Sequence, residues 1–143
     1  MTRMTKKFKI LAQFIKDISS ETPNIQSYIY VKENISKYHL SIDINSEPLK
    51  NKMIEVSTTL KFEDKEPNDK KSYFEIIYVS IVKIDEDIKD KKDLEKIILS
   101  DVQNDIYPNL EKAFLDLLHN SGFPEVKLEK KIDFNKLFNE RSN

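Results

Sequence analysis

The chain has 143 residues, with 24 Lys and Arg against 25 Asp and Glu and a formal net charge of −1. This length suits one domain with a single core, and charges of both signs that are interspersed give no electrostatic reason to expect a nucleic-acid partner. Cysteine is absent and glycine occurs once, which excludes disulfides, thiolate metal sites and Gly-rich phosphate loops. No apolar run reaches the roughly 20 residues of a membrane span and the N-terminus lacks a signal-peptide core, so we expect no direct membrane insertion. The absence of cysteine is compatible with the cytoplasm.

The first pattern after a short basic tail, expected to be flexible over residues 1–7, is an alternation over residues 8–18. The even positions, which include Phe8, Ile10 and Phe14, are mostly apolar, and this predicts a strand with one buried face. Asp17 and Glu21 have the other parity, so both carboxylates should lie on the opposite side if the strand continues. Residues 22–24, which include a proline, end it. Residues 25–38 stay ambiguous between a short strand and an aromatic loop.

Three further stretches predict strands. Residues 40–44 alternate cleanly, and residues 53–62 place four apolar side chains on one face and polar ones on the other. Residues 73–84 (YFEIIYVSIVKI) are rich in β-branched and aromatic residues and are apolar at both parities. Glu75 is the one break in the second apolar face. A sheet with helices on one side needs only one such face, so this strand requires a cover for the other.

The period then changes to that of a helix. Apolar residues from Leu94 to Leu118 fall on one stripe. Asp93 is placed to cap the start and Gly122 to end the helix. Pro108 predicts a break or kink near residues 105–107, and residues 132–138 predict a last short helix before a flexible tail at 139–143. Strands first and helices afterwards indicate an α+β fold: a four-stranded antiparallel sheet with a long, Pro-interrupted helical segment and a short C-terminal helix on one face.

Catalytic chemistry finds no support in these residues. His39 and His119 lie about eighty positions apart and neither has a neighbour at metal-ligand spacing. No nucleophile, base and orienting group occur together, so we expect no enzyme, no metal and no cofactor.

Three features of the sequence each allow two interpretations. The two-sided strand indicates an interface or burial under a loop. The aromatic residues indicate either a binding surface or core packing. The acidic residues, which are Asp17, Glu21 and Glu75, indicate either a contact site or ordinary solvation. The aromatic residues concerned are Tyr28, Tyr30, Tyr38, Tyr73, Phe74 and Tyr78.

A resemblance covers nearly the whole chain, from residue 8 to residue 138. Residues 16–24 (KDISSETPN) resemble the KDIS-x-E-x-PN segment that ends the first strand of the SecB protein-export chaperone family. Residues 40–44 and 54–56 match its next two strands, and Phe74-Glu75-Ile76 matches the acidic position of its fourth. Residues 122–128 (GFPEVKL) and 132–138 (IDFNKLF) resemble its GFP-x-x-x-L and IDF-x-x-L-F signatures, and Tyr107-Pro108 resembles the aromatic-Pro pair in its helix.

The resemblance implies a cytoplasmic, ATP-independent holdase that binds unfolded preproteins and delivers them to the translocase motor SecA. It implies a domain over residues 8–138 and a homotetramer, built as a dimer of dimers. Asp17, Glu21 and Glu75 match the family's SecA-contacting acidic residues. For the apolar client groove we expect Tyr28, Tyr30, Tyr73, Phe74, Ile76 and Tyr78. For the oligomer interface we expect Ile10, Phe14, Val102, Ile106, Leu110 and Phe114.

Two alternatives stay open beside the export chaperone. One is a SecB-fold chaperone dedicated to a single client such as an antitoxin. The other is an oligomeric protein-interaction domain with no activity toward unfolded chains. An RNA-binding sheet is a distant third, because helices are not interleaved between the strands and no face is basic.

Overall fold

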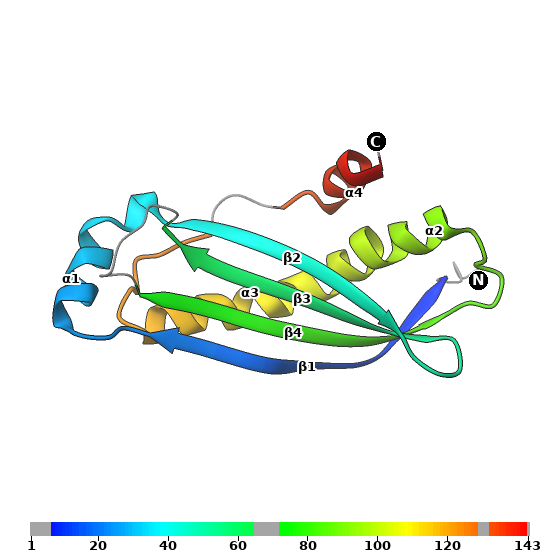
Figure 1. The fold of residues 1–143 in the computed structure, drawn as a ribbon, viewed down its shortest axis with the longest axis horizontal. Coiled ribbons are helices and arrows are strands. Elements are labelled where there is room, and N and C mark those ends of the chain that lie inside the picture. Colours follow the sequence, from blue (N-terminus) through cyan, green and yellow to red (C-terminus); the bar gives the residue numbers. More distant parts are fainter. Residues whose placement is uncertain (1–6, 65–71, 129–131, 143) are drawn as a thin grey trace, which may run out of the picture.

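A computed structural model describes residues 7–64, 72–128 and 132–142. The predicted α+β fold is confirmed: four antiparallel strands form one sheet in the order β1-β4-β3-β2, with the helices on one side (Figure 1). The elements in chain order are β1 (Phe8–Glu21), α1 (Ile25–Glu33), the 3-10 helix η1 (Ile35–Lys37), β2 (His39–Pro48), β3 (Met53–Glu63), β4 (Tyr73–Ile84), α2 (Lys91–Lys96), the π-helical turn η2 (Ile97–Asp101), α3 (Val102–Asn120) and α4 (Phe134–Ser142). None of the helices so described is long and apolar enough to cross a membrane.

The long helix α3 buries one apolar stripe against the sheet. Its residues Val102, Ile106, Leu110, Phe114 and Leu118 are fully buried, as the helical period predicts. They face the even-numbered side of β4, where Phe74, Ile76 and Val82 are also fully buried. The strands lie in front of α3 in Figure 1, so that view looks onto the face of the sheet that no described helix covers. We call it the open face.

Strand β1 departs from the simple alternation that its sequence suggests. It pairs with β4, but the register shifts between Ile10 and Ala12 and again between Ile15 and Asp17. Each β-bulge adds one unpaired residue and so reverses which parity faces the helices. Phe8 and Ile10 point to the helical side as expected, whereas Phe14 pairs with Val79 and lies on the open face. The prediction of one buried even-numbered face is therefore wrong in the middle of the strand.

The ambiguous stretch after β1 is a helix, so the expected strand or aromatic loop is wrong. Asn24 caps α1, because its side chain accepts a hydrogen bond of 2.9 Å from the Ser27 backbone N–H. Tyr28 and Val31, three positions apart on the same face, pack inward. A short helix with only two or three inward positions gives a weak periodic signal in the sequence.

The helical segment is irregular at a different place from the one predicted. α3 continues through Pro108, and the irregularity is the π-helical turn η2 that precedes it. Pro108 and Asn104 are both exposed, so the carbonyl that loses its helical partner can bond water instead. In η2 the Ile98 carbonyl accepts a 3.2 Å hydrogen bond from the buried side chain of Gln103, which in turn accepts one of 2.9 Å from Thr58 on β3. This cross-link satisfies buried polar groups that the π-helical turn leaves open.

The C-terminal helix α4 packs against η2. Phe134 is buried and meets the Tyr107 ring edge-on at 5.4 Å between ring centroids, and Ser100 hydrogen-bonds to Asn135. Since α4 runs to Ser142, the flexible tail expected over residues 139–143 is mostly helical. The N-terminal tail expected over residues 1–7 lies almost entirely outside the described residues.

The end of α3 is fixed by the single glycine of the chain. Gly122 has a φ of 106°, and the Phe123 N–H bonds to the Leu118 carbonyl at 3.1 Å and the Gly122 N–H to the His119 carbonyl at 3.2 Å. This pattern is a Schellman motif, in which a residue of positive φ ends a helix. The Tyr28 hydroxyl donates a 2.8 Å hydrogen bond to the Gly122 carbonyl, so the motif also holds α1 against the end of α3.

We expect the substitution Gly122→Ala to destabilise the fold by about 1–3 kcal/mol, because L-residues avoid this φ. A Cβ here would also lie 2.6 Å from the Tyr28 ring. Thermal melts followed by circular dichroism measure the effect, with Asn120→Ala on the exposed side of α3 as control. The same substitution in a Tyr28→Ala background should cost less, since the clash is gone. Equal costs in both backgrounds would mean that the ring contact does not matter.

Candidate functional site

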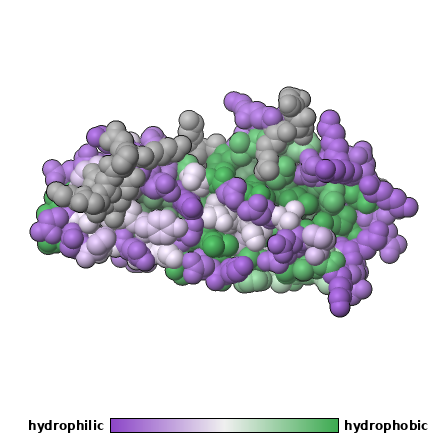
Figure 2. Space-filling model, in the orientation of Figure 1, coloured by the Kyte–Doolittle hydropathy of each residue, from purple (hydrophilic) through white to green (hydrophobic). Residues whose placement is uncertain are grey.

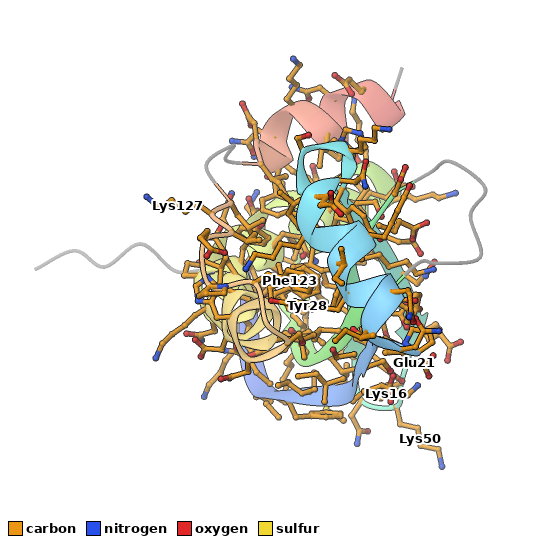
Figure 3. All side chains as sticks on the ribbon, turned by 90° about the vertical axis from the view of Figure 1, so that its left-hand side faces the viewer. Lys16, Glu21, Tyr28, Lys50, Phe123 and Lys127 are labelled. Carbon is orange, nitrogen blue, oxygen red and sulfur yellow. The ribbon has the colours of Figure 1, made fainter. Side chains whose placement is uncertain are left out.

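A hollow of about 360 Å³ opens where η1, β3 and the connector after α3 meet. Its apolar walls come from elements far apart in the sequence and include Ile35, Tyr38, Phe62, Phe123 and Val126. Phe123 is fixed there by the Gly122 turn and by the Tyr28 ring, which stacks on it at 5.2 Å between centroids. Figure 3 shows Tyr28 and Phe123 side by side under α1, with Lys127 pointing away from them.

A second hollow of about 610 Å³ continues from the first along β2. The two share Tyr38, Phe62 and Lys127, so they form one groove, which we call the β2 groove. On one side stand Leu40 and Ile42 of β2, and on the other stand the connector and α4. β2 is an edge strand of the sheet, and an edge strand presents unpaired backbone N–H and C=O groups beside the groove.

Tyr38 lies at the junction of the two hollows. Its ring is buried and packs on Phe62 at 5.4 Å. Burial raises the pKa of Tyr38 above its usual value, opposed in part by the Ser72 backbone, so the hydroxyl stays a neutral donor at physiological pH. That hydroxyl is itself buried from solvent, so Tyr38 contributes to the groove through its ring.

The residues predicted for a client groove do not form one surface. Phe74 and Ile76 are fully buried and Tyr78 is nearly so, because they are the core side of β4 beneath α3. Tyr73 lies on the opposite, open face of the same strand. Tyr28 supports the β2 groove from behind, and the Tyr30 hydroxyl binds Asp64 at 3.3 Å. In the single chain, Phe74 and Ile76 are therefore sealed in the core, apart from the β2 groove.

Sequence reasoning missed most of the groove's walls. Phe62 had been assigned to the buried face of a strand, and Phe123 and Val126 to a connector. The GFPEVKL segment that contains the last two held the strongest available signal, because a glycine at a helix end fixes the direction of the residues that follow it.

The open face of the sheet is acidic. From the strand registers and the alternation of side chains, its paired positions carry seven carboxylates and three lysines, a net charge of −4 on a chain whose total is −1. Lys16, which the second bulge leaves unpaired, lies beside Glu21 in Figure 3 and is not counted. The carboxylates are Asp17, Glu21, Asp43, Glu47, Glu55, Glu63 and Glu75, and the lysines are Lys9, Lys61 and Lys83. The three predicted acidic residues thus share one face, and Figure 3 shows Glu21 on the side opposite Lys127.

Tyr73 stands among these carboxylates at the α1 end of the open face. It is paired directly with Glu21. Burial and the neighbouring carboxylates, Glu75 first and then Glu63 and Asp17, raise the pKa of Tyr73 to about 12. Lys61 lies 3.5 Å from Glu75 and is half-exposed, so it screens only part of this negative field. The arrangement attracts positive charge to this end of the sheet.

The predicted oligomer interface falls mostly in the core. Val102, Ile106, Leu110 and Phe114 are buried against the sheet of their own chain, so the single chain does not expose them to a partner. Ile10 is half-buried, and Phe14 alone of the set is largely exposed. β1 instead exposes apolar side chains on both faces: Leu11, Phe14, Ile15 and Ile18 are each more than 40 % exposed.

The described residues contain no group of three His, Cys, Asp or Glu side chains placed to hold a metal ion. His119 binds the Val126 carbonyl at 2.9 Å, and in this way it fixes the connector that lines the groove. The geometry is suited to binding extended apolar chain at one surface and positive charge at another.

Comparisons with known proteins agree with this geometry. The family model described as preprotein translocase subunit SecB matches residues 2–143. A putative protein-export protein SecB of Pelagibacter ubique is 57 % identical over 98 % of this chain and 100 % of its own length. The protein-export protein SecB of Bartonella bacilliformis is 25 % identical over 94 % of this chain and 82 % of its own.

A solved structure shares the fold. The SecB-like chaperone of Mycobacterium tuberculosis, in complex with a peptide from an antitoxin, superposes with a TM-score of 0.62 at 12 % identity, over 87 % of this chain and 91 % of that one. The family model and the 57 % identical relative lead to one conclusion: this chain belongs to the SecB family, whose members are chaperones and not enzymes.

Proposed function

We propose that this protein is an ATP-independent holdase of the cytoplasm that binds unfolded preproteins and delivers them to SecA. The observation that carries the proposal is the β2 groove, which has apolar walls with charged side chains among them, is continuous over two hollows and opens beside an edge strand. Apolar burial is non-directional and roughly proportional to area, so such a groove accepts extended segments of many sequences. Edge-strand backbone groups add hydrogen bonds that likewise need no particular side chain.

Delivery requires a second surface that stays free while the groove is occupied. The open face meets this requirement, because the sheet itself separates it from the helical side. The net charge of −4 at its paired positions suits a basic segment of SecA, with Asp17, Glu21 and Glu75 as the contact residues at the α1 end. Charge complementarity of this kind raises the association rate more than the final affinity, and it weakens with salt.

A dedicated chaperone for a single client, such as an antitoxin, is the second candidate. The structural relative from Mycobacterium tuberculosis was solved with an antitoxin peptide, and the same groove could serve one client as well as many. An interaction domain without chaperone activity is the third. Breadth of binding separates these candidates, since a general holdase acts on unrelated unfolded chains.

We expect this protein to arrest the refolding of unrelated slow-folding secreted proteins when they are diluted from denaturant without ATP. Arrest should saturate near one assembly per client. Val126→Asp and Leu128→Asp place a charge on the half-buried groove wall, and each should weaken arrest roughly tenfold, because apolar client would then have to cover an unpaired charge. Refolding yield against chaperone concentration measures the effect.

Leu49→Asp is the matched control, since Leu49 is an exposed apolar residue at the β2–β3 turn, away from the groove. It should leave arrest unchanged. Arrest of one client alone would favour the dedicated chaperone, and arrest that survives both groove substitutions would show that clients bind elsewhere.

Charge reversal tests delivery separately from holding. The triple substitution of Asp17, Glu21 and Glu75 by Lys turns the α1 end of the open face positive, and it should reduce SecA binding at least tenfold at low salt. Refolding arrest should persist, because none of the three residues lines the groove. Isothermal titration with SecA at two salt concentrations measures the loss. If SecA binds the triple variant as well as the parent chain, the contact lies elsewhere.

We further propose that the chains assemble as a homotetramer, with β1 as one of the pairing edges. β1 is 14 residues long, lies at the edge of the sheet and exposes apolar residues on both faces. A long apolar edge strand left open invites edge-to-edge aggregation, and pairing with a second copy satisfies the backbone groups of that edge while the open face stays free.

Native mass spectrometry should therefore give about four times the chain mass of 16.9 kDa. The double substitution of Ile15 and Ile18 by Glu should yield monomers or dimers, because it places charge where apolar side chains would be covered. Leu49→Glu changes an equally exposed apolar residue outside β1 and should leave the tetramer intact. A monomer in the parent chain would contradict the proposed assembly.

A further inference from the structure

An apolar strip lies on β1 and β4 in the middle of the acidic open face. Phe14 of β1 pairs with Val79 of β4, and Ile77 and Ile81 flank Val79 on the same side of that strand. Val79 is fully buried, although no described helix covers this face. Neighbouring side chains must cover it, and its direct partner Phe14 is itself 47 % exposed. Figure 2 views this side and shows hydrophobic surface between the charged side chains over the sheet.

The two bulges of β1 are what place Phe14 in this strip. The first bulge, between Ile10 and Ala12, turns Phe14 from the helical side to the open face. The second, between Ile15 and Asp17, restores the parity, so that Asp17 lies beside Ile77 on the same face. An exposed aromatic ring is thereby placed directly next to the carboxylates. A surface that bound its partner through charge alone would need no apolar residue at this position.

The strip and the carboxylates lie at a spacing that an extended chain can match. The Phe14–Val79 pair is two residues along β4 from Ile77 and four from Glu75, or roughly 13 Å at the rise of a strand. Side chains at alternate positions of an extended segment point the same way. An apolar residue followed by basic residues two and four positions later would therefore meet the strip and the carboxylates together.

We propose that the open face binds an extended basic segment of a partner protein through an apolar anchor as well as through charge. Phe14, Ile77 and Ile81 take one apolar side chain of the segment, while Asp17, Glu21 and Glu75 pair with its basic residues. Charge complementarity selects the occupant: the acidic open face attracts a basic segment and repels an acidic one. This inference rests on the proposed contact with a basic partner and adds the apolar determinant to it.

The test uses labelled nine-residue peptides and the whole protein. One peptide carries Phe with Arg two and four positions later, the second has Ser in place of Phe, and the third moves Phe by one position so that it points away from the Arg side. Fluorescence anisotropy should show the first binding roughly tenfold more tightly than the other two, since burial of one aromatic side chain is worth about that factor.

Phe14→Ser should bring that ratio close to one without weakening the Ser peptide. Ile77→Thr should also bring the ratio close to one. Because Ile77 lies on β4, this variant controls for an effect of Phe14→Ser on the pairing of β1, and native mass spectrometry of each variant detects a change in assembly. Leu49→Ser, at 40 % exposure and away from the strip, should keep the full ratio, and so should the groove variant Val126→Asp. A ratio near one in the parent protein, or one that survives both strip substitutions, would overturn the inference.

Failure of this inference and failure of the holdase proposal give different results. If refolding arrest holds but none of the three peptides binds, the open-face anchor is wrong and the holdase stands. If the Phe peptide binds more tightly than the other two as expected but no client is arrested, the open face binds its partner and the chaperone activity is absent. If lysine at Asp17, Glu21 and Glu75 leaves the peptides bound as before, the charged part of the contact is wrong.

Discussion

The packing of α3 on β4 is the contact on which the rest of this molecule depends. The helix has one apolar stripe, and this stripe packs against the chain's own sheet, where five of its side chains are buried from solvent. A single helical layer covers a single face, so the sheet keeps an open face and a β1 edge with exposed apolar side chains. Both surfaces that we assign to partners follow from this imbalance.

The β2 groove forms where the helical layer stops short of the sheet. α3 lies over β4 and β1, whereas β2 is flanked by the connector and α4 (Figure 1). The connector is held by the Gly122 turn, by the hydrogen bond from Tyr28 and by His119 on the Val126 carbonyl. The wall of the groove therefore rests on a few specific polar contacts together with Phe123, which is buried and meets the Phe74 ring edge-on at 5.7 Å between ring centroids.

Local patterns in the sequence predicted the elements whose signal is repeated over many residues. β3 alternates over eleven positions and α3 repeats its stripe over five turns. The strand was placed correctly, whereas the helical segment begins at Lys91 and is capped by Asp90, not by Asp93. β1 was predicted as a strand, but its two bulges leave no mark in composition, and each one reverses the side chains that follow. α1 was missed because a nine-residue helix with two inward positions resembles a loop. The groove could not be predicted at all, since its walls come from η1, β3, the connector and α4, which only the tertiary fold brings together.

The bulges also explain why the acidic residues and the apolar strip occur on one face. With no bulge, odd positions of β1 would face outward throughout and Phe14 would point under α3. With one bulge, Asp17 and Glu21 would turn to the helical side and their charge would have to be buried or paired at high cost. Only an even number of bulges keeps both carboxylates outward. Because the two bulges lie on either side of residues 12–15, Phe14 is exposed between these carboxylates and the end of the sheet where Lys9 pairs with Lys83. A surface that needed charge alone would gain nothing from this arrangement, whereas a surface that binds charge and one apolar side chain together requires it.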